Sequence, residues 1–151
     1  MTRREQREAV LELLFETEFK KDESAEDIFA LAVQNREFSV EAGSYIKDVY
    51  FDLLDKLEVI DEMIGKCSEG WKTARLSRLS RSVLRLCVYE LLYRDDIPTN
   101  VSINEAVELS KKFDDPKAKS FVNGVLNGVK NLIEKQGKPS SDKGEENGDH
   151  A

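Results

Sequence analysis

The sequence predicts an all-α fold, and three observations support that class. Apolar residues recur at spacings of three and four through most of the chain, as they do on one face of a helix. Capping pairs, in which Ser or Thr is followed three residues later by an acid, precede several of these segments. The doubled Asn-Gly of "SFVNGVLNGV" (120–129), ordinarily a hairpin signal, is flanked by adjacent apolar pairs instead of the alternation typical of a strand.

The first two helices are expected to begin at capping residues. Thr2 and Glu5 have the spacing of a capping box. Apolar residues follow on one helical face, namely Ala9, Val10, Leu13 and Leu14. Ser24 and Asp27 open a second helix in the same way. The apolar residues of that helix are Ile28, Leu31 and Ala32.

The middle of the chain predicts one long helix and a connector. Ser39 is expected to cap the helix, which should end near Gly65. Its apolar residues stand at helical spacing and are Ile46, Val49, Tyr50, Leu53, Leu54, Leu57, Ile60 and Ile64. The stretch "EGWKTARLSRLS" (69–80) predicts a short helix or a connector.

The next segment, "SRSVLRLCVYELLYR" (80–94), is apolar nearly all round, which is typical of a central buried helix. Pro98 should end it. Ser102 and Glu105 predict a capping box for the following helix. Asp115 and the proline after it predict the N-cap and first position of the last helix.

In that last helix the apolar side chains fall within one arc, and Asn123 and Asn127 lie on the opposite face. Gly124 and Gly128 form a strip beside the arc. Each interior glycine costs about 1 kcal/mol relative to alanine. The strip therefore indicates that another backbone comes close, either a neighbouring helix or a bound partner.

Residues 1–135 are predicted to form one domain, because a chain of this length can bury a core. Residues 136–151 have no large apolar side chain and are predicted to be a disordered polar tail. No apolar run approaches the roughly 20 residues of a membrane span. The charged N-terminus lacks the apolar stretch of a signal peptide, so a cytoplasmic location is expected.

The composition argues against catalysis. The only histidine is His150, in the polar tail, so neither a histidine base nor a histidine metal ligand is expected. Cys67 and Cys87 lack a CxxC or histidine companion, and both are interpreted as buried reduced thiols, with no zinc site. The chain has no Gly-rich cofactor-binding loop and no catalytic CxxC-type motif. Lysine or carboxylate chemistry is not excluded, although the sequence shows no motif for either, and no cofactor is expected.

The net charge of −7 opposes nucleic-acid binding, but local charge departs from that sum. Arg3, Arg4 and Arg7 gather on one side of the first helix, and Phe15 continues their stripe. Guanidinium groups bind phosphate, and an exposed ring can stack on an unpaired base. A solvated N-terminus with Phe15 in the core is the alternative.

A second basic run consists of Lys72, Arg75, Arg78, Arg81 and Arg85. This run is either another anion-binding surface or the complement of acidic faces in the same molecule.

Three stretches resemble the family of the transcription antitermination factor NusB. They are "VLRLCVYELLYRDDIP" (83–98), "VSINEAVELSKKF" (101–113) and "SFVNGVLNGV" (120–129), preceded by an arginine-rich first helix. Their order, spacing and connecting lengths match together over roughly residues 3–134. The resemblance implies a compact all-helical fold of about seven helices in two small bundles, without enzymatic activity.

The resemblance also implies partners. The family binds the boxA element of ribosomal RNA leader and antiterminator transcripts as single-stranded RNA. It does so as a heterodimer with NusE, which is also a ribosomal small-subunit protein, in the antitermination complex of an elongating RNA polymerase. Some members form homodimers that hide the RNA surface. A homodimeric helical scaffold without intrinsic RNA affinity is the alternative, and no membrane role is expected.

Positions carried over from the family imply an RNA-binding set: Arg3, Arg4, Arg7, Phe15, Phe113, Lys117 and Phe121. Phe15 stands where tyrosine can occur, so stacking is kept and a hydroxyl hydrogen bond is lost. Lys117 stands where an acid can occur, which favours phosphate. Ser80 occupies an often acidic position on the NusE-facing side and is expected to keep an N-cap role. Whether Phe121 faces the core or RNA stays open, and the basic run is assigned no role.

Overall fold

The structure is a computed structural model that describes residues 1–35, 44–68 and 76–138. Over these ranges the chain forms seven α-helices and no strand, which confirms the predicted all-α class. The helices are α1 (Arg3–Phe19), α2 (Ala25–Gln34), α3 (Ser44–Asp55), α4 (Leu57–Cys67), α5 (Arg78–Tyr93), α6 (Thr99–Phe113) and α7 (Ala118–Gln136).

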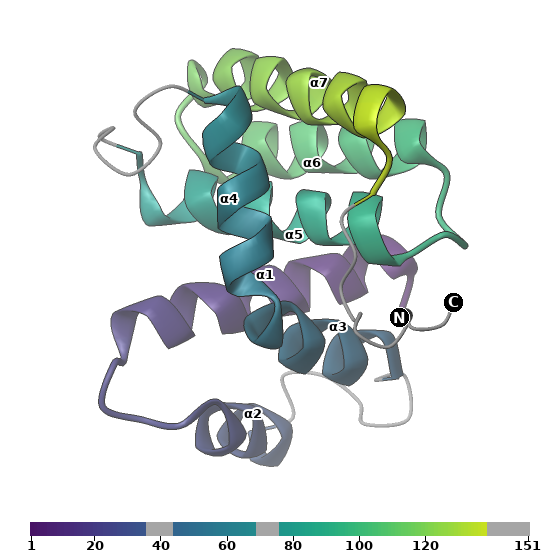
Figure 1. The fold of residues 1–151 in the computed structure, drawn as a ribbon. Helices are drawn as coiled ribbons and strands as arrows, with labels where there is room; N and C mark the ends of the chain where they lie inside the picture. The colour runs from purple at the N-terminus through teal and green to yellow at the C-terminus, as the bar shows by residue number, and fades with distance from the viewer. Residues whose placement is uncertain (36–43, 69–75, 139–151) are drawn as a thin grey trace, which may run out of the picture.

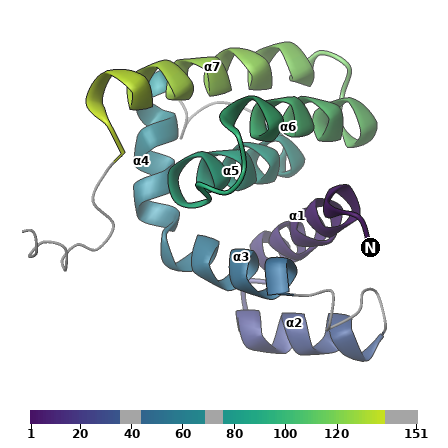
Figure 2. The ribbon, with the colours of Figure 1, turned by 90° about the vertical axis from the view of Figure 1, so that its right-hand side faces the viewer.

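The helices form two groups that meet along α1 and α5. In Figure 1, α1, α2 and α3 lie below and α5, α6 and α7 lie above, while α4 runs upright from the level of α7 past α5 to α3. Helix α1 contacts α2 and α3 in its own group and α5 in the other. Figure 2 shows α6 and α7 stacked as neighbours along their lengths. The predicted arrangement of two small bundles is confirmed.

The first two helices begin where the capping residues predict. The Thr2 hydroxyl accepts from the Glu5 amide at 3.1 Å, and the Thr2 amide donates to the Glu5 carboxylate at 2.9 Å. Ser24 caps α2 by accepting from the Asp27 amide at 3.0 Å. Leu31 was expected on the apolar face but is 45% exposed, because α2 is an outer helix that buries a narrower face.

The single long helix expected to end near Gly65 is in fact two helices, α3 and α4. The break falls at Lys56, whose amide donates to both Asp52 and Leu53 carbonyls at 3.1 and 3.0 Å. The break lets α3 pack on α1 while α4 packs on α5 and α7. No proline or glycine marks it, and apolar spacing continues across it. Ser39, the predicted cap, lies outside the described residues.

Helix α5 is the central buried helix that its sequence predicts. Leu84 and Val88 are fully buried, and α5 contacts α1, α4, α6 and α7. The predicted capping box after it is wrong, because α6 already begins at Thr99, with Pro98 in the N-cap position. Ser102 therefore lies inside α6, where its hydroxyl turns toward α5.

The doubled Asn-Gly lies in a helix, as predicted, although α7 begins at Ala118, later than expected. A turn precedes it, in which Asp115 accepts from the Lys117 amide at 2.9 Å. A Cβ added at Gly128 would lie 3.2 Å from Cys67 Cβ on α4, so this glycine marks a close helix contact. Gly124 has nothing within 4 Å of such a Cβ, and the predicted strip of close contact holds only at Gly128.

Cys87 is buried, as predicted, and its thiol lies 3.4 Å from the Ser102 carbonyl oxygen, whereas Cys67 is only half-buried.

Among the helices of the described ranges, none is both long and apolar enough to cross a membrane. Lys72, Arg75 and His150 lie outside the described residues. The same holds for most of the tail that was predicted to be disordered, residues 139–151.

Candidate nucleic-acid interface

Arg7 is buried, which corrects the expectation that its guanidinium is available to phosphate. The residue is 4% exposed because α1 turns this side toward the core, with Val10 and Leu14 one and two turns further on. Arg7 Nε donates to Glu90 Oε2 at 2.8 Å, and Arg7 Nη2 donates to Glu90 Oε1 at 3.2 Å. A phosphate could reach Arg7 only by displacing a buried carboxylate.

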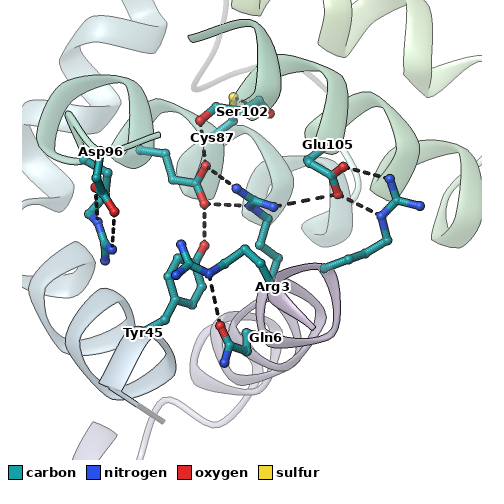
Figure 3. Close-up of polar contacts among 11 residues, drawn as sticks. Arg3, Gln6, Tyr45, Cys87, Asp96, Ser102 and Glu105 are labelled. Carbon is teal, nitrogen blue, oxygen red and sulfur yellow. Dashed lines mark hydrogen bonds and ion pairs between the residues drawn. The ribbon is translucent and has the colours of Figure 1, made fainter. Parts of the chain in front are cut away.

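The Glu90 carboxylate is the centre of a polar cluster inside the protein. Besides Arg7, it accepts hydrogen bonds from the hydroxyls of Tyr45 and Ser102, the latter at 2.7 Å. Figure 3 shows Tyr45 and Ser102 converging on it from α3 and α6. Glu90 is 1% exposed, and a buried charge is tolerated only with such partners. The cluster therefore ties the first turns of α1 to three other helices.

The pKa values of Arg7 and Tyr45 keep each of these two groups in one protonation state near neutral pH. Burial opposes the charge on Arg7, but the hydrogen bond and attraction to Glu90 outweigh it, so the Arg7 pKa lies above its usual value. Burial, together with the nearby charge of Glu90, holds the pKa of Tyr45 far above its usual value. Arg7 thus stays cationic, and Tyr45 stays a neutral hydrogen-bond donor.

Arg3 and Arg4 lie at the exposed start of α1. Arg4 Nε and Nη2 donate to Glu105 Oε1 and Oε2 at 2.9 and 2.7 Å, yet the Arg4 side chain is 55% exposed. The hydrogen bonding from Arg4 lowers the pKa of the Glu105 carboxyl. The Arg3 guanidinium lies 4.4 Å from the centroid of the Tyr45 ring, and its Nε donates to Gln6 at 3.1 Å (Figure 3). Both arginines are accessible to phosphate, Arg4 by exchanging Glu105 for it.

Phe15 and Phe113 line one groove of about 710 Å³ between α1 and the end of α6. They are 40% and 44% exposed, so the alternative that places Phe15 in the core is wrong. Lys112 Nζ lies 5.1 Å from the centroid of the Phe113 ring and forms an ion pair with Glu8 at 2.8 Å. The α1 side of the groove carries three acids: Glu5, Glu8 and Glu12. The two rings therefore lie beside negative charge.

Lys117 and Phe121 lie at the start of α7, across a short loop from Phe113. Phe121 is 37% exposed whereas Val122 is fully buried, so Phe121 lies at the margin of the apolar face with part of its ring accessible. Lys117 is exposed and occupies the N-cap position without a side-chain capping bond. The start of a helix carries positive partial charge, and Lys117 adds to it.

Ser80 is buried, which corrects both the predicted partner contact and the predicted N-cap. The N-cap of α5 is Ser77, whose hydroxyl accepts from the Ser80 amide at 2.9 Å. The hydroxyls of Ser80 and Ser77 both donate to Asp114 Oδ2, the latter at 3.0 Å. Ser80 is 3% exposed. Its hydroxyl therefore ties the start of α5 to the end of α6.

Two arginines of the basic run on α5 are paired with acids of the same chain. Arg81 forms an ion pair with Glu18 at 2.8 Å. Arg85 donates two hydrogen bonds to Asp61, at 2.9 and 2.8 Å. This confirms, for these two arginines, the interpretation that the run complements acidic faces elsewhere in the molecule.

Glu90 and Tyr45 were not singled out from the sequence, although both organise the start of α1. A signal for Glu90 was present, because an acid inside a helix that is apolar all round requires a buried partner. Its partner Arg7 is 83 residues away, and no spacing rule connects residues so far apart.

The chain resembles known proteins in sequence and in fold. Residues 4–131 match the NusB family. The transcription antitermination protein NusB of Natranaerobius thermophilus is 46% identical over 139 residues, which cover 89% of this chain and 99% of that protein. A structure of T. maritima NusB is 34% identical with a TM-score of 0.79, covering 92% and 94% of the two chains. A crystal structure of the antitermination factors NusB and NusE in complex with dsRNA matches at 27% identity and a TM-score of 0.75, covering 86% and 96%.

The all-α fold and these matches place the protein in the class of small helical RNA-binding factors that act in transcription antitermination. Within that class, the chain belongs to the NusB family. The resemblance inferred from the sequence is thereby confirmed.

Proposed function

We propose that this protein binds boxA single-stranded RNA together with NusE and so modifies an elongating RNA polymerase. One observation carries the RNA part of the proposal. Among the described residues, four phenylalanines are exposed, and three of them belong to the RNA-binding set implied by the family: Phe15, Phe113 and Phe121. Unpaired bases stack on exposed aromatic rings.

The phosphates are assigned to the cations that remain accessible around these rings. Arg3 and Arg4 supply guanidinium groups at the start of α1, and Lys117 supplies an ammonium group at the start of α7. Arg7 positions the first turn of α1 from inside and does not contact RNA in this proposal. The surface thus combines phosphate contacts that position the strand with rings that stack on its bases.

NusE is assigned to the acidic side of the groove between α1 and α6. Glu5, Glu8 and Glu12 disfavour phosphate and would pair with cationic side chains of a protein partner. Leu79, next to the buried Ser80, lines the same groove and adds apolar surface. Ser80 contributes by holding this corner of α5 against Asp114.

Titration of labelled boxA RNA with the protein, alone and with an excess of NusE, tests this proposal. A scrambled RNA of the same length serves as the control. We expect boxA to bind more tightly than the scrambled RNA, and NusE to increase the difference. No gain from NusE would contradict the heterodimer, and equal binding of the two RNAs would contradict the boxA assignment.

Sedimentation at several protein concentrations, with and without RNA, separates this function from the homodimeric scaffold. RNA binding by a monomer or by the NusE heterodimer supports the proposal. A stable homodimer that binds no RNA, even with NusE present, supports the scaffold instead.

A further inference from the structure

Helices α6 and α7 form a second groove, of about 440 Å³, that the proposed function leaves unused. It lies on a different side of α6 from Glu105, the partner of Arg4. Each helix contributes two asparagines spaced four residues apart, and Lys119 and Ser120 line the end at the start of α7. The four asparagines are Asn100, Asn104, Asn123 and Asn127.

The charge of this groove differs from that of the chain as a whole. The chain has 30 acidic and 23 basic residues, and the groove between α1 and α6 carries three glutamates. None of the described residues that line the groove between α6 and α7 is acidic, and Lys119 gives it positive charge. A polyanion can therefore enter this groove without meeting a carboxylate on its lining.

Helix stability does not explain the asparagines, because asparagine is a poor helix former. Asn127 Nδ2 donates to the Asn123 carbonyl oxygen at 2.9 Å, and Asn100 accepts from Lys130 at 3.4 Å. The side-chain amides of Asn104 and Asn123 have no hydrogen-bond partner within the described part of the chain. Two carboxamides, one from each helix, are thus available to a ligand.

We propose that this groove binds unpaired nucleotides that flank boxA in the same RNA strand. This inference rests on the proposed function. A carboxamide presents a donor and an acceptor side by side, and this pair matches the hydrogen-bonding edge of a base. Single-stranded RNA exposes those edges. Lys119 would neutralise a phosphate beside them.

The groove adjoins the boxA surface at two points. Ser120, which lines it, immediately precedes Phe121, so a strand stacked on the Phe121 ring can continue into the groove. Asn104 immediately precedes Glu105, so the groove and the Arg4 site share one turn of α6. One RNA strand can therefore contact both surfaces.

Binding of extended RNAs tests the inference. The probes are boxA RNA alone and boxA RNA with an unpaired extension of about eight nucleotides at either end, a length within the range that small single-strand sites cover. We expect one of the two extended RNAs to bind the wild-type protein about tenfold more tightly than boxA alone, which is about 1.4 kcal/mol. Asn123→Asp should abolish that gain because it places a carboxylate in the groove.

Asn131→Asp is the matched control, because it makes the same change on an exposed part of α7 that does not line the groove. It should keep the gain, and both variants should bind boxA alone equally. If neither extension strengthens binding, or if the two variants behave alike, the inference is wrong while the proposed function stands.

A direct readout keeps the inference testable even if boxA itself fails to bind, which would contradict the proposed function. The side-chain amide NMR signals of Asn104 and Asn123 should shift when the unpaired oligonucleotide is added alone at low salt. Unchanged signals would overturn the inference. Signals that shift with NusE and not with RNA would show a protein-binding groove and would overturn it too.

Discussion

Arg7 of α1 and Glu90 of α5 form a buried ion pair held by two hydrogen bonds, and it joins the two groups of helices. The pair fixes the first turns of α1 from inside, so that Arg3 and Arg4 are presented outside. Arg7, an arginine of the predicted RNA-binding set, thus positions the proposed RNA surface from inside the fold.

Arg7→Met should lower the free energy of unfolding by about 3–5 kcal/mol, because it leaves the Glu90 carboxylate buried without a counter-charge. The double variant Arg7→Met/Glu90→Gln should lose less than Arg7→Met alone, since no charge is then buried. Urea unfolding followed by circular dichroism measures both. Lys112→Met, which breaks an exposed pair with Glu8, is the control and should cost about 0–1 kcal/mol. Equal losses for Arg7→Met and Lys112→Met would refute the role of the buried pair.

Ionisation of Tyr45 should lower the free energy of unfolding at alkaline pH. Its folded-state pKa is raised, whereas in the unfolded chain it ionises near the ordinary value of about 10. The folded state then holds the proton that the unfolded state loses, so stability is full below about pH 10 and falls as the pH rises toward the folded-state pKa. Tyr45→Phe removes this contribution and, near neutral pH, costs about 1.5–3 kcal/mol for the lost bond to Glu90.

The measurement is the difference in unfolding free energy between wild type and Tyr45→Phe at about pH 8 and about pH 10.5. Taking this difference cancels the titration of lysines and of the other tyrosines. The difference should shrink at the higher pH. A difference that stays constant would show that Tyr45 ionises in both states alike.

The two glycines of α7 should respond differently to alanine. Gly124→Ala should stabilise the protein by about 0.5–1 kcal/mol, because the helix gains propensity and the added Cβ meets nothing within 4 Å. Gly128→Ala should gain less or lose stability, because its Cβ would lie 3.2 Å from Cys67 Cβ, and α4 and α7 would have to move apart. Thermal unfolding of the two variants decides the point, and equal gains would show that α7 does not need glycine at 128.

Arg4 should contribute one phosphate contact to boxA binding. Arg4→Gln is expected to reduce the slope of log affinity against log salt by about 1. Lys135→Gln removes the same charge in the last turn of α7 and should leave the slope unchanged. Glu105→Gln should raise the affinity, because it removes the carboxylate that competes with phosphate for Arg4. A slope that is the same for Arg4→Gln and wild type would remove Arg4 from the interface.

Local pattern was enough to predict the helical class, the capping of α1 and α2, the central burial of α5 and the helix at the doubled Asn-Gly. Each of these features depends on residues within a few positions of one another. The break at Lys56 could not be predicted, because the apolar spacing continues across it. The position of the break depends on tertiary packing, because α3 packs on α1 whereas α4 packs on α5 and α7.

The exposure of the candidate rings could be predicted from the sequence, whereas the burial of Arg7 and Ser80 could not. Phe15, Phe113 and Phe121 are accessible, as a surface that stacks bases requires. Arg7 and Ser80 were assigned to ligands from their positions in the family. A position along the chain does not show whether the side chain is buried in the fold. Their partners, Glu90 and Asp114, come from distant segments and decide which side chains are already satisfied within the fold.

The most direct test of the RNA surface is the affinity of Phe121→Ala for boxA RNA in the presence of NusE, compared with that of Phe19→Ala. Both rings are exposed, and Phe19 lies outside the predicted set. Stacking of one base is worth about 1–3 kcal/mol, so Phe121→Ala should weaken binding by about 5- to 150-fold, while Phe19→Ala binds like wild type. Wild-type affinity in Phe121→Ala, with the fold intact, would contradict the proposal that this surface stacks the bases of boxA.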